Sequence, residues 1–185
     1  KPSKMPGWAY GLPAKECKTG SKLVKVEGST CHGCYALKGC YVFKVVQEAQ
    51  YRRLASVKHE LWTAAMALLI NSKKSKYFRW HDSGDVQDED HLLKIFAVCK
   101  LTPSVKHWMP TREAWVKRFL PLKPHNLIIR FSAPMVDQEA PSSWPHTSTV
   151  VTSGRTCPAP TQDNECKDCR ACWDPTVKNV AYVQH

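Results

Sequence analysis

The sequence predicts an α/β protein built on a mostly parallel sheet, either a partial (β/α) barrel or an open curved sheet. Segments of strand composition alternate with segments of helical periodicity, an order that favours parallel strands joined by helices. The chain has 185 residues, whereas a closed eight-fold barrel usually needs about 250. We expect one domain, with a cysteine-containing entry loop over 1–40, the α/β core over 41–153 and a cysteine-rich irregular tail over 154–185.

The first half of the chain gives the clearest alternation. A short strand is expected at 8–10, in a stretch otherwise rich in Gly, Pro and Lys. No Gly or Pro occurs over 41–72, where apolar residues recur at helical spacing, and a break is expected near Ser56. Residues 76–81 have strand composition and end in an Asp-Ser-Gly-Asp turn. Asp88 then caps a helix. The apolar face of this helix holds Leu92, Ile95, Phe96 and Cys99.

The second half continues the pattern with shorter elements. A short helix is expected over 115–120, stopped by the prolines at 121 and 124. Further strands are expected over 105–109, 127–131, 149–152 and 180–183.

Polar residues follow the predicted strands, at the edge where open parallel sheets bind ligands. Helix capping explains some of them, Thr111 most obviously. These residues are His81, Asp82, Ser83, Asp85, Thr111, Arg112, Glu113, Ser132, Thr152 and Ser153.

Charge and hydropathy narrow the function classes. The formal net charge is +11 and the pI is about 9.3, which fits an acidic protein partner or nucleic acid, although a basic surface also serves solubility alone. No apolar run approaches the roughly 18 residues of a membrane span, and the basic start lacks the apolar core of a signal peptide. We therefore expect a cytoplasmic protein without a membrane partner.

Nine cysteines are the strongest chemical feature. An odd number excludes complete internal pairing, and a chain of this length can build a core without disulfides. In a reducing compartment, thiols are first interpreted as metal ligands or catalysts.

The tail carries the sharpest motif. Cys166, Cys169 and Cys172 form a C-x2-C-x2-C run, which is a recurring iron–sulfur arrangement, and Cys157 lies nine positions upstream as a fourth ligand. Zinc sites usually use two separated C-x2-C pairs instead. We therefore expect these four thiols to bind an iron–sulfur cluster.

A second group precedes the long helical stretch. Cys17, Cys31 and Cys34 supply three thiolates, which would leave one iron of a cluster open to a small molecule. Cys40 is close enough in sequence to compete for the fourth position. His32 lies between two ligands and is interpreted as a bystander.

A zinc alternative joins the two chain ends. Cys31 and Cys34 with Cys166 and Cys169 would form a four-thiolate zinc site, but this leaves three nearby cysteines unexplained. Cys99 lies on an apolar helix face and is expected in the core.

The order of cysteine loop, long helix and strand ending in Ser83-Gly84-Asp85 resembles the start of a radical S-adenosylmethionine enzyme. More closely, the chain resembles the phage "gene product 88" family, through Leu12–Ala14, the CYALKG segment at 34–39, the FRWHDSGD segment and the C-terminal cysteine segment ending in Cys-Trp. The resemblance implies phage origin, a host-cell cytoplasm, and one or two [4Fe–4S] clusters. It also implies S-adenosylmethionine, oriented by Ser83, Gly84 and Asp85, although thirteen residues separate Cys17 from Cys31 where the radical-enzyme loop has three.

Three functions remain open at this point. In the first, the N-terminal cluster cleaves S-adenosylmethionine, and Arg112, Glu113 and Ser132 line the substrate side. In the second, the protein is a non-catalytic electron carrier or redox sensor whose partner is an acidic host redox protein. In the third, it is a zinc-stabilised nucleic-acid module whose seven tryptophans stack bases and whose 27 Lys and Arg meet phosphates. Core packing is the better explanation for most of these tryptophans.

Overall fold

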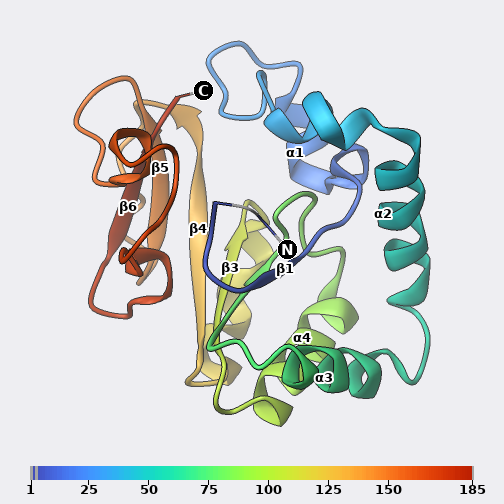
Figure 1. Ribbon diagram of the computed structural model, residues 1–185. Helices are drawn as coiled ribbons and strands as arrows, with labels where there is room; N and C mark the ends of the chain where they lie inside the picture. The colour runs from blue at the N-terminus through green and yellow to red at the C-terminus, as the bar shows by residue number, and fades with distance from the viewer. Residues whose placement is uncertain (1, 3, 185) are drawn as a thin grey trace.

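A computed structural model describes residues 2 and 4–184 as an α/β fold on one open six-stranded sheet (Figure 1). Every strand pairs in parallel with its neighbours, and the spatial order follows the chain order. The prediction of an open, parallel sheet is therefore confirmed. The strands are β1 (Trp8–Tyr10), β2 (Tyr77–Trp80), β3 (Lys106–Thr111), β4 (Leu127–Val136), β5 (Thr147–Val151) and β6 (Asn179–Val183).

The helical segments also follow the sequence pattern, with two differences. The long stretch breaks after Ser56, as expected, whereas the entry loop contains a short helix that was not expected. The helix expected over 115–120 does not end before Pro121. It is a 3-10 helix that includes Pro121 and ends at Leu122. The helices are α1 (Lys18–Leu23), α2 (Lys44–Ser56), α3 (Trp62–Ser72) and α4 (Glu89–Leu101), and the 3-10 segments are η1 (Ala14–Glu16), η2 (Tyr35–Leu37), η3 (Gly39–Val42), η4 (Ala114–Leu122), η5 (Ala159–Thr161) and η6 (Ala171–Trp173).

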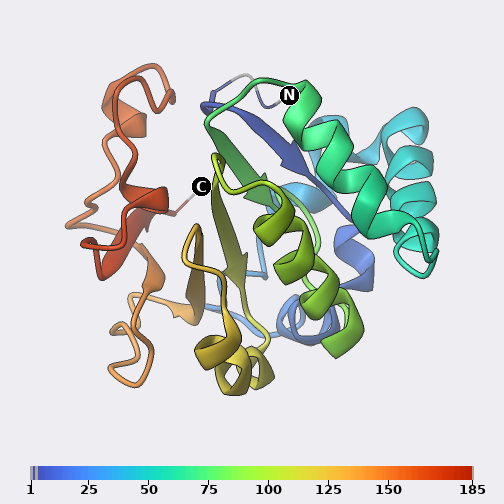
Figure 2. The same cartoon turned by 90° about the horizontal axis from the view of Figure 1, so that it is seen from below.

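Helices cover one face of the sheet and the cysteine-rich tail covers the other. Figure 2 shows α3 and α4 beside β1, β2 and β3 on one side, and the C-terminal segment on the opposite side. On β2, Phe78 and Trp80 enter the buried core that α3 and α4 share. Because side chains alternate along a strand, Arg79 between them faces the tail.

The local interactions that set α4 confirm the predicted cap. The Asp88 carboxylate accepts a 2.9 Å hydrogen bond from the backbone N–H of His91, and Cys99 lies fully buried on the apolar face. No helix of the described chain is long and apolar enough to cross a membrane.

The entry loop returns to the carboxyl end of the sheet. The backbone N–H of Thr30 donates to the Pro134 carbonyl at 2.9 Å, and Ser29 forms an isolated antiparallel bridge with Met135. Strand β4 extends to Val136, past the predicted end at Phe131, and this extension holds the loop. The cysteines of the loop are therefore carried to the edge where β2 and β3 also end.

Candidate metal centres

All nine cysteines are free, and the structure separates seven of them into two groups. The tail group is Cys157, Cys166, Cys169 and Cys172. The N-terminal group is Cys17, Cys31 and Cys34. Among residues 2 and 4–184, no set of three or more His, Cys, Asp or Glu side chains has the spacing that holds a single metal ion.

The four tail thiols line one small cavity. Pro158, Ala159, Ala171, Trp173 and Val180 complete its wall, so that every other lining side chain is apolar. Backbone hydrogen bonds fix the segment on both sides. The N–H groups of Thr156 and Cys157 both donate to the Ala181 carbonyl at 3.0 Å, and the Cys169 N–H donates to the Cys166 carbonyl at 2.8 Å.

Arg130 anchors this tail to the sheet. The side chain is fully buried on β4, and its guanidinium donates to three carbonyls of the tail and to two at the β5 and β6 strands. The acceptors are the carbonyl oxygens of Ala171, Cys172, Asp174, Thr147 and Lys178, at 2.8 to 3.3 Å. The sequence predicted neither this burial nor this role, because Lys and Arg are normally exposed.

Arg79 lies between the two groups. Its Cζ is 4.7 Å from the Trp108 ring centroid, and its Nη2 donates to the Tyr35 hydroxyl at 3.2 Å. Tyr35 directly follows Cys34, while the positive charge of Arg79 also acts on Cys166 and Cys172. One arginine therefore faces the tail thiols and contacts the N-terminal loop.

Two of the tail thiols have a raised pKa in the absence of a metal. Burial raises the pKa of Cys172 to about 11, although a hydrogen bond with Tyr182 and the charges of Arg130 and Arg79 lower it. The sulfur of Cys172 lies 3.1 Å from the Tyr182 hydroxyl oxygen. Burial and the charges of Cys157 and Cys169 raise the pKa of Cys166.

Two of the three N-terminal thiols lie beside Gly20. A Cβ atom at Gly20 would lie 3.6 Å from the sulfur of Cys17 and 3.6 Å from the sulfur of Cys31. Burial, followed by the negative charges of Asp85, Cys34 and Cys31, raises the pKa of Cys17. The structure thus brings together the three thiols that the sequence proposed, across the thirteen-residue separation.

Charged residues that follow β2 and β3 act on this group. Burial raises the pKa of Cys31, while the guanidinium of Arg112 lowers it. Arg112 also donates to the carbonyls of Ser132 and Ala133, at 3.2 and 2.7 Å. These two hydrogen bonds connect the segment after β3 to strand β4. The Ser132 hydroxyl itself pairs with Ser148.

Asp85 joins the ends of two strands. Its carboxylate accepts the backbone N–H groups of Val86 and Arg112 at 2.7 and 2.8 Å. Burial raises its pKa to about 6 despite these two hydrogen bonds. The contacts identify Asp85 as a support for the Arg112 backbone beside Cys31.

The rest of the Ser-Gly-Asp turn packs on the entry loop. The Ser83 hydroxyl donates to the Leu12 carbonyl and accepts from Gln50, both at 2.8 Å. Gly84 has φ +75°, and a Cβ there would lie 2.6 Å from the Cβ of Leu12, so only glycine fits. Ser83 and Gly84 therefore pack against the segment around Leu12, which leads to Cys17.

Glu113 holds the first helix of the entry loop. Its carboxylate accepts the backbone N–H and the hydroxyl of Thr19, at 2.9 and 3.0 Å, and the Trp115 indole N–H at 3.2 Å. This places a negative charge at the start of α1, directly after Cys17. Glu113 was expected to line a substrate, but its carboxylate instead accepts three hydrogen bonds from within the protein.

The two remaining cysteines stand apart. Cys40 is exposed, and Cys99 is buried in the helix-covered core. His32 bonds through Nδ1 with the Val24 carbonyl at 3.1 Å, which supports its interpretation as a bystander. The cysteine charges that act on Cys31 and on Cys166 come from their own groups, from Cys34 for the first and from Cys157 and Cys169 for the second, whereas the zinc alternative would mix the two groups.

A family model described as Gene product 88 matches residues 1–150. No curated protein and no solved structure matches the chain. The matched region contains the N-terminal thiols and the turn after β2, and it ends before the cysteine-rich tail.

Proposed function

Because the chain belongs to the phage-type Gene product 88 family and gathers seven of its nine cysteines into two groups, we propose that it is an iron–sulfur electron-transfer protein. The observation that carries this proposal is the tail cavity lined by four thiols and apolar side chains alone. Soft thiolate sets of this kind select iron–sulfur clusters or zinc over hard cations.

A cluster fits the tail thiols better than a single ion. Zinc holds four sulfurs at about 2.3 Å from one point, whereas each thiolate of a [4Fe–4S] cluster binds a different iron and the set is wider. The C-x2-C-x2-C spacing of the tail is the iron–sulfur one. Cys157, Cys166, Cys169 and Cys172 would hold this cluster.

The surroundings of the tail cavity suit a negatively charged centre. Arg79 and Arg130 offset thiolate charge, and the Tyr182 hydroxyl is placed to donate to the Cys172 sulfur. Hydrogen bonds to the sulfurs and nearby positive charge raise the reduction potential of a bound cluster. When bound, such a cluster supplies reversible one-electron transfer.

The N-terminal thiols fit a second cluster with three protein ligands. Cys17, Cys31 and Cys34 would hold it at the carboxyl edge of the sheet, next to Arg112. The residues for an S-adenosylmethionine amino group fit less well, since Ser83 and Asp85 are bonded to Leu12, Gln50, Val86 and Arg112. We therefore propose cluster binding alone there and assign Ser83, Gly84 and Asp85 to the support of the loop.

Anaerobic purification with iron and acid-labile sulfide counts, followed by electron paramagnetic resonance, tests the proposal. Two [4Fe–4S] clusters give about eight irons and about eight sulfides per chain. The pair Cys166→Ser and Cys169→Ser should remove about half of the iron, and Cys31→Ser with Cys34→Ser the other half. Exposed Cys40→Ser is the control and should keep all of it. Colourless protein that carries zinc and no inorganic sulfide would refute the proposal.

A further inference from the structure

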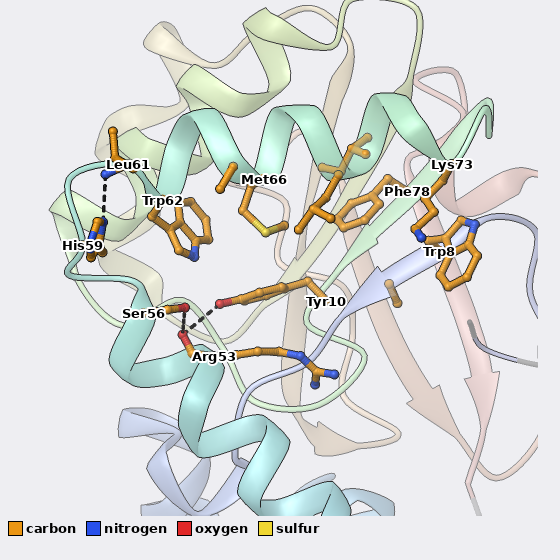
Figure 3. Close-up of a pocket in the computed structure, with 14 residues that line it drawn as sticks. Trp8, Tyr10, Arg53, Ser56, His59, Leu61, Trp62, Met66, Lys73 and Phe78 are labelled. Carbon is orange, nitrogen blue, oxygen red and sulfur yellow. Dashed lines mark hydrogen bonds between the residues drawn. The ribbon is translucent and has the colours of Figure 1, made fainter.

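The helix-covered side of the molecule contains a pocket that no cysteine lines. It lies between the end of α2, the length of α3 and the edge strand β1, and its volume is about 470 Å³. Figure 3 shows Trp62 and Met66 above it, Tyr10 crossing it and Arg53 below. A volume of this size is within the range of pockets that bind organic ligands.

Aromatic side chains form the walls of this pocket. Trp8, Tyr10, Trp62 and Phe78 line it from β1, α3 and β2. The rings of Tyr10 and Trp62 pack edge to face with centroids 5.8 Å apart, which fixes both walls. Rigid aromatic walls favour a flat apolar body, which can stack without ordering flexible side chains.

The charged groups around the pocket are cationic. Arg53 and Lys73 carry positive charge, and the Arg53 guanidinium also donates to the Gly11 carbonyl at 3.3 Å. The lining contains no Asp or Glu. Charge complementarity therefore calls for a ligand with a negative, acceptor-bearing group.

Trp62 supplies an independent sign of a missing partner. Its side chain is 96% buried, and its indole N–H faces the Tyr10 hydroxyl without a hydrogen bond of normal geometry. In Figure 3 this nitrogen points down into the space above the Tyr10 hydroxyl. A buried donor without an acceptor costs about 1–3 kcal/mol, and a ligand oxygen placed there would recover that cost.

We propose that this pocket binds a flat, largely apolar organic anion, with its ring system along the wall that Tyr10, Trp62 and Met66 form and its acidic group beside Arg53. Binding there is independent of the tail thiols, because the pocket and the tail lie on opposite faces of the sheet.

The test is a fluorescence titration with the aromatic sulfonate 8-anilinonaphthalene-1-sulfonate as the probe, and with the uncharged N-phenyl-1-naphthylamine as its matched analogue. The sulfonate should bind at one site per chain, about tenfold more tightly than the neutral analogue, with an affinity that falls as salt rises.

Two matched pairs of variants locate the site. Ala65 and Ala64 are neighbours exposed on α3, but only Ala65 lines the pocket, so Ala65→Trp should abolish binding and Ala64→Trp should preserve it. Arg53→Gln should weaken sulfonate binding about tenfold, whereas Arg52→Gln, one residue away and outside the pocket, should not.

Three results would overturn the assignment. Unchanged binding by Ala65→Trp would place the probe elsewhere. Equal affinity for the neutral analogue, or no effect of Arg53→Gln, would remove the anionic group from the proposal. A wild-type dimer in sedimentation velocity that Ala65→Trp converts to a monomer would make the pocket an interface with a second copy.

Discussion

Nη2 of Arg130 donates a 2.8 Å hydrogen bond to the carbonyl of Ala171, one residue before the last cysteine of the tail. Four further hydrogen bonds from the same guanidinium reach other carbonyls. A single strand residue therefore determines how the cysteine-rich segment lies on the sheet.

Arg130→Met should detach the tail while keeping the side-chain volume. Five carbonyls would each lose one hydrogen-bond donor, and we expect the free energy of unfolding to fall by about 3 kcal/mol, measured by urea denaturation. Arg155→Met, at an exposed position, is the control. A loss no larger than that of the control would contradict the anchoring role.

Gly20→Ala should disturb the N-terminal thiols specifically. The added methyl would meet the Cβ of Cys17 at 3.0 Å and both sulfurs at 3.6 Å, inside the space that a cluster would need. We expect anaerobically purified protein to lose about half of its iron and to keep the tail cluster. Gly33→Ala, whose Cβ would meet nothing within 4 Å, should keep both.

Glu113→Gln should weaken the attachment of α1. The amide keeps one acceptor oxygen for the two Thr19 donors and the Trp115 N–H, and charge-assisted hydrogen bonds contribute about 1.5–3 kcal/mol. We expect a destabilisation of about 2 kcal/mol by chemical denaturation. A double-mutant cycle with Thr19→Val should give a coupling energy near 1 kcal/mol, roughly one hydrogen bond; additive effects would argue against a direct contact.

Buried histidines should make the protein less stable in mild acid. Burial lowers the pKa of His107 from 6.5 to about 3, so the unfolded chain binds a proton between those values that the folded chain does not. The contribution of neutral His107 to stability is full above pH 6.5 and declines as the pH falls. Burial acts in the same direction on His91, whose pKa falls to about 4.

The measurement is the free energy of unfolding from pH 7 to pH 4. His107→Gln should reduce its slope below pH 6 by up to about 1.4 kcal/mol per pH unit, the value of one proton. His125→Gln, at an exposed position, is the control for removing a histidine. An unaltered slope in His107→Gln would show that this side chain is not a buried neutral base.

Much of the fold could be predicted because its determinants are local. The alternation of strand and helix, the break after Ser56 and the Asp88 cap each depend on residues a few positions apart. Two features could not be predicted in this way: the 3-10 helix across Pro121 and the extension of β4 to Val136. Packing against distant segments decided both of them. The cysteine spacings likewise predicted two groups of thiols from the sequence alone.

The surroundings of those thiols were decided by tertiary structure alone. Spacing identifies a sulfur ligand, but it does not reveal that Arg79 and Arg130 are enclosed beside the tail, or that the Ser83–Asp85 turn is bonded to the entry loop. Buried cations and orphaned donors such as the Trp62 N–H arise where segments far apart in sequence meet. The chain by itself therefore determines which sulfur atoms are available as ligands for the proposed clusters, and only the packed sheet decides the charge and the hydrogen bonds around them.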